Sequence, residues 1–341
     1  MKVLPVEKAI GQVLGQDLTK IIPGEFKGPA FRKGRIIKEE DIPHLLQMGK
    51  ENVFVYELDE NSLHENDAAR ILAAGIAGEG MALGEAKEGR ANLLAVEKGL
   101  LKVDVNGLYA ANRQQEIAIS SIHNNSVVNA GDLSAAVKII PLVVEKKKIE
   151  DIIRQVKENG PLVSVKPLKP LATSLIITGN EVYHGRIADR FAPVIEAKMQ
   201  KFDCEIISKE YLPDDSIKIS DAIKKARDAG AGLILVTGGM AVDPDDSTPA
   251  AILAAGGQAV SYGVPLMPGA MFMLAYLDDL PIMGLPGGAM YYKTTVFDLL
   301  LPRILAGERV QKEDIVVLSH GGLCLTCSVC TYPKCHFGKS I

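Results

Sequence analysis

The sequence predicts an α/β fold: a doubly wound, mostly parallel sheet preceded by a mixed α+β N-terminal module. Its 341 residues are enough for two or three domains. From about Pro161, nearly continuous apolar strands alternate with helical patterns, as in a parallel sheet covered on both faces. Before that point, short β-rich runs are separated by Gly and Asn. We expect three parts: the mixed module at 1–160, the α/β domain at 161–307 and a cysteine-rich tail at 308–341.

The N-terminal module is predicted to contain three helices and several short strands. Pro43 fits the first turn of the first helix. Ser62 and Glu65 form a capping-box pattern before the second, and Asn159-Gly160 ends the third. The expected helices are at 38–50, 62–78 and 144–159, with strands at 52–58, 92–97, 100–105, 116–122 and 135–144.

The second domain shows the strand and helix alternation most clearly. The expected strands are at 173–181, 204–212 and 231–239, each running towards a polar loop, and the helices are at 189–202, 216–230 and 248–257. The apolar stretch 259–277 contains Gly263, Pro265, Pro268 and Gly269, so it predicts buried strands joined by a tight loop. In the tail, 314–318 predicts a short strand.

Composition narrows the function classes. The formal net charge is −4, and the one basic run, Lys146 to Lys148, fits a solvated helix face, so we expect no nucleic-acid partner. The N-terminus lacks the apolar core of a signal peptide, and no membrane partner is expected. Four of the five cysteines crowd the tail, which is not a scaffold of structural disulfides. A cytoplasmic protein is predicted.

Polar loops follow three of the expected strands, beginning at Thr178, Pro213 and Thr237. In open α/β sheets, ligands bind beyond the carboxyl ends of the strands. Glycine lets backbone N–H groups approach a ligand, and helix N-termini bind phosphate. Carboxylates suit such a site if Mg²⁺ lies between them and phosphate, or if they transfer protons. The crowding of Asp243, Asp245 and Asp246 favours this reading, because their mutual repulsion needs an offsetting cation or donor.

Ordinary helix capping is the competing explanation for part of this pattern. Asp215 and Ser216 are suited to cap the helix that follows them. Thr248-Pro249 is a common helix start.

Five motifs in the same order resemble the molybdopterin-binding domain of the molybdenum-cofactor biosynthesis proteins MoeA, gephyrin and MogA. The resemblance covers roughly 169–305, and residues 1–60 also look like the MoeA N-terminal region. The motifs are TGNEV (178–182), LPDDS (212–216), TGGMAVDPDDSTPAA (237–251), MPGAM (267–271) and GLPGGAMYYK (284–293). The resemblance implies a doubly wound domain that binds the pterin phosphate, or its adenylated form, beyond the strand ends.

The resemblance also implies roles for individual residues. Glu181, Asp214 and Asp246 would be catalytic, surrounding Mg²⁺, the phosphates and the arriving molybdate. It further implies a homodimer, with molybdopterin, molybdate and a molybdoenzyme as partners. The residues expected to bind the pterin ligand are Thr178, Gly179, Asn180, Thr237, Gly238, Gly239, Asp243, Asp245, Ser247, Thr248, Pro268, Gly269, Pro286, Gly287 and Gly288.

Several positions depart from the family pattern. Met240-Ala241 stands where the family has Ser or Thr followed by Gly, Asn180 replaces Asp, and Gly288-Ala289 replaces Asn-Pro. The Ser-x-x-Asp-Gly-Tyr-Ala motif is missing. Three functions stay open: Mg²⁺-dependent transfer of molybdate to adenylated molybdopterin with release of AMP, a non-catalytic carrier or sensor of the cofactor, and a CinA-like nucleotide pyrophosphate hydrolase. The sequence does not decide between catalysis and binding.

The tail predicts a metal site. Cys324, Cys327, Cys330 and Cys335 have spacings of two, two and four residues. Four thiolates saturate a tetrahedral Zn²⁺, and the run differs from a ferredoxin pattern by one residue in its last interval. Zinc and an iron–sulfur cluster remain equal alternatives, beside an unliganded or redox-active thiol group.

Overall fold

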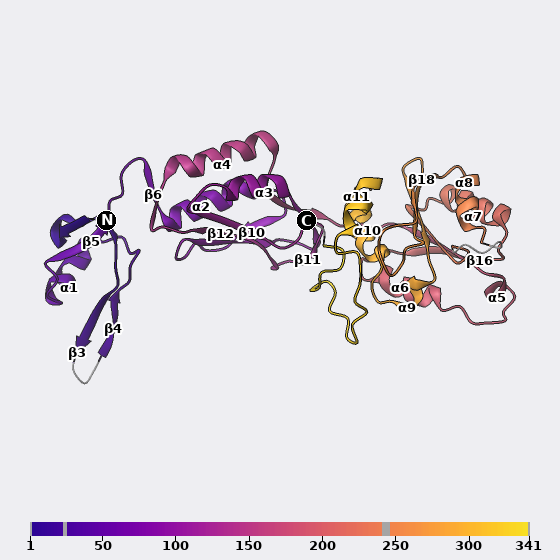
Figure 1. The fold of residues 1–341 in the computed structure, drawn as a ribbon, viewed down its shortest axis with the longest axis horizontal. Helices are drawn as coiled ribbons and strands as arrows, with labels where there is room; N and C mark the ends of the chain where they lie inside the picture. Colours follow the sequence, from indigo (N-terminus) through magenta and orange to yellow (C-terminus); the bar gives the residue numbers. More distant parts are fainter. Residues whose placement is uncertain (1, 23–25, 241–245, 340–341) are drawn as a thin grey trace. The chain divides into compact units, whose positions relative to one another are not determined.

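The computed structural model describes residues 2–22, 26–240 and 246–339 (Figure 1). The chain divides into two compact units, Met1–Lys166 and Pro167–Ile341. Within those described ranges, no helix has the length and apolar character needed to cross a membrane.

The first unit begins with a three-stranded sheet of order β1-β5-β2 and a β3-β4 hairpin. Val53 and Val55 of β5 pack with Val6, Leu14 and Leu45 in a small core. The predicted first helix is confirmed as α1, with Pro43 in its first turn. The elements are β1 (Lys2–Pro5), η1 (Val6–Lys8), β2 (Val13–Leu14), β3 (Leu18–Ile22), β4 (Phe26–Phe31), η2 (Glu39–Asp41), α1 (Ile42–Gln47) and β5 (Asn52–Tyr56).

The rest of this unit packs helices against a sheet of order β10-β12-β8-β7 (Figure 1). Leu72 and Ile76 of the second helix and Ile149 of the fourth meet Leu93 and Val137 of the sheet. The elements are β6 (Ser62–His64), α2 (Glu65–Ile76), β7 (Met81–Leu83), β8 (Arg90–Ala95), β9 (Gly99–Val103), α3 (Val105–Asn112), β10 (Ile117–Ser121), β11 (Val127–Val128), β12 (Leu133–Ile139), β13 (Val143–Glu145), α4 (Lys146–Asn159) and β14 (Val163–Pro167).

The helix caps of this unit agree with the sequence prediction at one helix and differ from it at two others. Helix α4 ends at Gly160 with φ 101°, as predicted. The Ser62 cap was wrong: Ser62 pairs with Glu145 in the β6–β13 ladder, and His64 caps α2 by accepting from the Asn66 N–H at 3.2 Å. Helix α3 was not predicted. Its cap is Asp104, whose carboxylate accepts from the Gly107 N–H at 3.0 Å.

The second unit is built on a six-stranded sheet of order β16-β15-β17-β20-β19-β18. The first four strands in this order are mutually parallel, and β19 is antiparallel to both of its neighbours. The elements are β15 (Thr173–Thr178), α5 (Asn180–Tyr183), α6 (Phe191–Gln200), β16 (Ile206–Leu212), α7 (Ser216–Asp228), β17 (Leu233–Thr237), α8 (Thr248–Ala254), β18 (Gln258–Tyr262), β19 (Met273–Leu277), β20 (Leu280–Leu285), α9 (Gly288–Tyr291), α10 (Val296–Leu305), α11 (Lys312–Val316) and η3 (Val317–Ser319).

Alternate residues of the central strands enter two separate cores. Leu233 and Leu235 of β17 pack on the side of α6 and α10, whereas Ile234 and Val236 pack on the side of α7 and α8. Figure 1 shows these helix pairs on opposite faces of the sheet. A strand buried on both faces is apolar at most of its positions, which explains the runs Leu175–Ile177 and Leu233–Val236. The predicted doubly wound, mostly parallel sheet is confirmed.

The segment after Gly307 differs from its prediction. Residues 314–318 were expected to form a strand but lie in α11 and η3. A local reason is the cap at Gln311, whose N–H donates to the Asp314 carboxylate at 2.8 Å. Arg303 of α10 donates to the other oxygen of Asp314 at 2.8 Å, which holds the turn against the domain.

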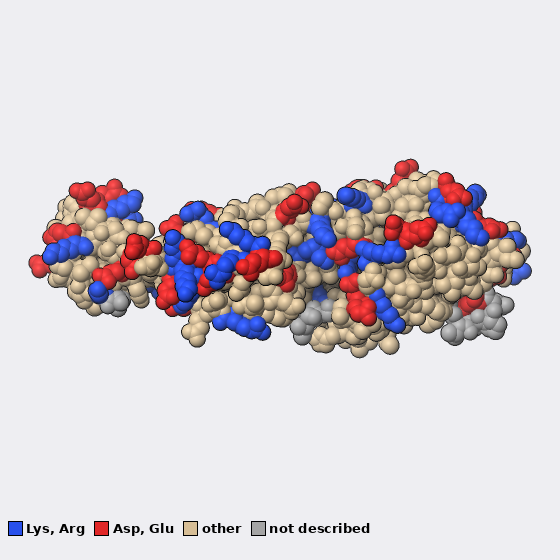
Figure 2. Space-filling view, turned by 90° about the horizontal axis from the view of Figure 1, so that it is seen from above, with Lys and Arg blue, Asp and Glu red and all other residues tan. Residues whose placement is uncertain are grey.

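On the face of the molecule shown in Figure 2, basic and acidic side chains are intermixed within each unit.

Candidate functional site at the strand ends

The carboxyl ends of four parallel strands lie level at one edge of the six-stranded sheet. Thr178 of β15 is in register with Leu212 of β16, and Thr237 of β17 is in register with Leu285 of β20. The chain leaves β15 towards α6 on one face and leaves β17 towards α8 on the other. Diverging connections of this kind open a crevice between two strands, the usual ligand position in doubly wound sheets. Four of the predicted motifs therefore meet where a ligand is expected.

Buried threonine hydroxyls hold the turn after β17. The Thr248 hydroxyl donates to the carbonyl of Gly238 at 2.9 Å and lies 3.4 Å from the Thr178 hydroxyl. Thr248 is fully buried and Thr178 nearly so. Thr178 and Thr248, both predicted to bind the ligand, therefore hold the backbone of the Gly238 turn in place.

The two glycines of this turn are required by the fold itself. Gly238 has φ 90°, and a Cβ there would lie 2.2 Å from the carbonyl oxygen of Thr178. Gly239 has φ 53°, and its Cβ would lie 2.9 Å from the Thr248 hydroxyl. Any larger side chain would combine backbone strain with a steric clash. Substitutions at these positions cannot separate a ligand role from a structural one.

Gly287, in the loop after β20, differs from these two glycines because the space beside it is open. Its φ is −49°, and a Cβ added there would meet no atom within 4 Å. The fold therefore does not require glycine at this position. A Cβ built on the adjacent Gly288 would lie 3.9 Å from the Gly269 nitrogen, so the Pro286–Gly288 and Pro268–Gly269 motifs are neighbours.

The first two predicted catalytic acids occupy adjacent loops. Asp214 accepts from the backbone N–H of Asn180 at 2.9 Å, and the Asn180 side chain accepts from the Asp214 N–H at 3.4 Å. This reciprocal pair ties together the loops after β15 and β16. Glu181 is exposed, with its carboxylate close to Gly179. Asp215 caps α7, as predicted, by accepting from the Ile217 and Lys218 N–H groups.

The third acid, Asp246, is half-buried, whereas Asp243 and Asp245 lie outside the described residues. Burial and the negative charge of Asp246 raise the pKa of Tyr262 above its ordinary value. The Tyr262 hydroxyl donates to the Met240 carbonyl at 3.4 Å. Tyr262 ends β18, which runs in the same direction as β20 and so finishes at the same edge. Sequence reasoning missed this phenol, because no local motif marks it.

The proximity of Asp246 to Tyr262 gives a direct prediction. Asp246→Asn removes a negative charge that disfavours the phenolate, so the pKa of Tyr262 should fall. It should stay above the ordinary value, because burial is unchanged. A pH titration of the tyrosine Cζ resonances measures this shift. Tyr211, whose pKa is raised by burial and Asp189, is the internal control and should not move. If the pKa of Tyr262 does not change, Asp246 does not lie close to this phenol.

Two buried hydroxyl groups at this edge lack a hydrogen-bond partner among the described residues. The Thr237 and Ser247 hydroxyl oxygens are inaccessible to solvent, and neither has a hydrogen-bond partner within the described part of the chain. Buried polar atoms are normally paired, because an unpaired one costs about 1–3 kcal/mol. Both belong to the predicted ligand-binding set.

Met240 occupies the position where a hydroxyl was expected by resemblance. It is almost fully buried and packs into the core beside Gly284, where an added Cβ would lie 2.7 Å from the methionine sulfur. Its side chain therefore serves packing. The departure from the family pattern removes a polar group from the ligand side of the turn.

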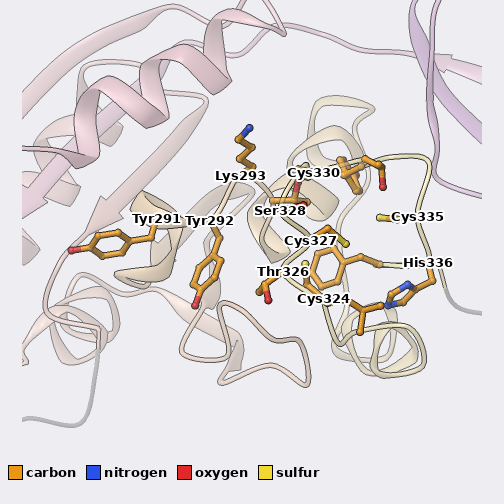
Figure 3. Close-up of a pocket in the computed structure, with 15 residues that line it drawn as sticks. Tyr291, Tyr292, Lys293, Cys324, Thr326, Cys327, Ser328, Cys330, Cys335 and His336 are labelled. Atoms are coloured by element: carbon orange, nitrogen blue, oxygen red, sulfur yellow. Dashed lines mark hydrogen bonds between the residues drawn. The ribbon is translucent and has the colours of Figure 1, made fainter.

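The tail cysteines line a cavity of their own. Cys324, Cys327, Cys330 and Cys335 all line one cavity of about 440 Å³, together with Tyr291 to Thr294 (Figure 3). All five cysteines of the chain are described, and none forms a disulfide. Burial, Asp298 and the nearby cysteines strongly raise the pKa of Tyr332. Among the described residues, no three or more His, Cys, Asp or Glu side chains are grouped closely enough for one metal ion. The metal site stays a prediction.

Comparisons with known proteins agree with the motifs. Residues 174–306 match a family model described as a probable molybdopterin binding domain, and residues 3–57 match one described as a domain of unknown function (DUF8806). The molybdopterin molybdenumtransferase of Haemophilus influenzae is 27% identical over 45% of this chain and 39% of its own length. That of Synechococcus elongatus is 25% identical over 40% of this chain and 36% of its own length. The chain thus spans about two fifths of the curated relatives it matches.

Two solved structures are also similar. The tungsten cofactor synthesizing protein MoaB from Pyrococcus furiosus is 19% identical, covers 42% of this chain and 99% of its own, and has a TM-score of 0.35. The molybdopterin biosynthesis MoeA protein from Pyrococcus horikosii is 14% identical, covers 90% of this chain and 75% of its own, and has a TM-score of 0.33.

The family model begins in β15 and ends just after α10, so it contains all of the strand-end loops described above. The match to the molybdopterin-binding family model thus falls on the same residues as the five motifs.

Proposed function

We propose that residues 167–341 bind molybdopterin, or its adenylated form, in the crevice between the ends of β15 and β17. The observation that carries the proposal is the convergence of the Gly179, Gly238 and Gly287 loops at one sheet edge beside Asp246. Small residues there let backbone N–H groups approach phosphate oxygens. The match of residues 174–306 to the molybdopterin-binding family supports this ligand class.

We further propose that the site transfers molybdate to adenylated molybdopterin with release of AMP. Mg²⁺ is commonly held by one or two carboxylates, several waters and the phosphates of its substrate, so it needs no dense ligand cage. Asp246 is a candidate to hold it, because it is half-buried at the edge where the strand-end loops meet. When bound, Mg²⁺ would neutralise developing charge on the phosphates. The names of the two curated relatives support a transferase.

A carrier or sensor without catalysis is the second candidate. The buried Met240 favours it, because the expected oxyanion-binding hydroxyl is replaced by a packing residue. A homodimer, a molybdoenzyme partner and a cytoplasmic location stay predictions.

Incubation of the purified full chain with adenylated molybdopterin, Mg²⁺ and molybdate separates the candidates. AMP release that depends on molybdate supports transfer. Tight binding without turnover supports the carrier. AMP release without molybdate supports a pyrophosphate hydrolase, and failure to bind the pterin at all contradicts the whole proposal.

Gly287→Val tests the ligand position without disturbing the fold. The added side chain meets open space, so the melting temperature should change little. If the pterin phosphate approaches this loop, the new atoms obstruct it, and binding should weaken at least about tenfold. Ala254→Val, an exposed position at the end of α8, adds a similar bulk and should bind normally. Titration calorimetry measures both variants. Normal binding by Gly287→Val would remove this loop from the site.

A further inference from the structure

The cysteine segment is anchored to the second unit at both of its ends. At its start, the Met267 N–H donates to the Gly322 carbonyl, and the Cys324 N–H donates to the Met267 carbonyl, both at 2.8 Å. At its end, the Phe337 side chain is buried in the main core, and the Gly338 N–H donates to the Gly321 carbonyl at 3.0 Å. The segment is therefore a closed loop whose geometry is fixed by the domain.

This loop forms one wall of the sulfur-lined cavity (Figure 3). Its other wall, Tyr291 to Thr294, follows the Gly284–Gly288 motif directly. The volume of about 440 Å³ is far larger than the share of about 30 Å³ that one water takes in the liquid. The four cysteines lie around this space from different sides of the loop.

We propose that this cavity holds an iron–sulfur cluster of the four-iron type, ligated by Cys324, Cys327, Cys330 and Cys335. In such a cluster each thiolate binds a different iron atom, so the four sulfurs surround a volume. In a Zn²⁺ site all four must lie about 2.3 Å from a single point. Within the described ranges, no three ligating side chains meet in that way. The cavity of about 440 Å³, lined by all four cysteines, has room for a cluster that brings its own sulfide.

The surroundings of the cavity suit this occupant. Tyr332 and Phe337 supply apolar and aromatic surface, and the Thr294 hydroxyl lies 3.8 Å from the Cys330 sulfur, within range of a weak hydrogen bond. Such outer contacts control solvent access and tune a bound cluster. The His336 Nε2 hydrogen-bonds the Leu323 carbonyl at 2.8 Å, which fixes the ring in the cavity wall. Cys327 and Cys330 are exposed, and they give iron and sulfide a route of entry.

The test is reconstitution of the full chain with ferrous iron and sulfide under anaerobic conditions. We expect about four iron and four sulfide per chain, with visible absorbance that dithionite bleaches. Cys327→Ser and Cys330→Ser should each lose most of that iron. Because both side chains are exposed, their far-UV circular dichroism should match the parent. Cys204→Ser, at a buried position just before β16, is the control and should keep the full iron content.

Three outcomes would overturn the proposal. One zinc per chain without sulfide, retained during reconstitution, would show a mononuclear site. Four freely titrating thiols and no iron would show an unliganded thiol group. Equal iron in the parent and in both folded tail variants would show adventitious iron only.

Discussion

Asp246→Asn is expected to lower the proposed molybdate-dependent AMP release by at least about 100-fold, because the substitution keeps the shape of the side chain and removes its charge. Asp246 is half-buried at the sheet edge where the strand-end loops meet, close enough to Tyr262 to raise the pKa of that phenol. A carboxylate in this position would hold the Mg²⁺ that screens the phosphates of the pterin ligand. Single-turnover assays of AMP release measure the effect.

Asp215→Asn is the matched control for this prediction. Asp215 lies at the same sheet edge but caps α7, and asparagine caps helices as well as aspartate does. Its AMP release should therefore equal that of the parent. If Asp246→Asn folds and turns over normally, Asp246 has no part in the reaction. If both variants lose activity equally, the loss reflects the general negative charge of the edge.

Lys198→Met should destabilise the second unit by about 3 kcal/mol, because it leaves the partner carboxylate of a buried ion pair without a cation. The Lys198 ammonium lies 2.6 and 2.7 Å from the two oxygens of Asp298 and donates to the Lys293 carbonyl at 3.1 Å. Only 10% and 18% of the two side chains is exposed. This pair ties α6 to α10 and to the loop that borders the cysteine cavity.

Lys209→Met provides the comparison for an exposed pair. The Lys209 ammonium lies 2.8 Å from the Glu196 carboxylate, but both side chains are 39% exposed. Screening by water limits such a pair to less than about 1 kcal/mol. Hydrogen exchange of β15 and β17 peptides in urea reports the unfolding free energy of this unit even if the two units unfold separately. Equal losses in the two variants would show that burial of the Lys198 pair is unimportant.

Many of the elements could be read from the sequence, for identifiable reasons. The strands β15 and β17 carry the apolar runs Leu175–Ile177 and Leu233–Val236 because they are buried on both faces, and this pattern has few alternatives. Caps were less secure. Asp215 and Gly160 were read correctly, but Ser62 was drawn into a ladder with β13, an interaction between residues more than eighty positions apart. A local motif carries no information about such a partner.

In the candidate site, too, local sequence indicated some features and distant contacts decided others. Strand direction and loop chemistry alone indicated that the loops beginning at Thr178, Pro213 and Thr237 would share one edge, since parallel strands end together. The Gly287 loop was added to them only by the family resemblance. Only the tertiary structure distinguished the glycines: Gly238 is required by the Thr178 carbonyl, whereas Gly287 faces open space.

The sequence by itself determined which residue types carry chemistry in this protein and the order of the strands and helices that present them, because both depend on local composition and periodicity. The tertiary structure decided their surroundings. It placed Tyr262 beside Asp246, buried Met240 against Gly284, and closed the cysteine segment over a cavity by anchoring Phe337 in the core. Each of these contacts joins residues that are distant in the chain or on different elements, and their energy depends on packing and burial that no short segment records.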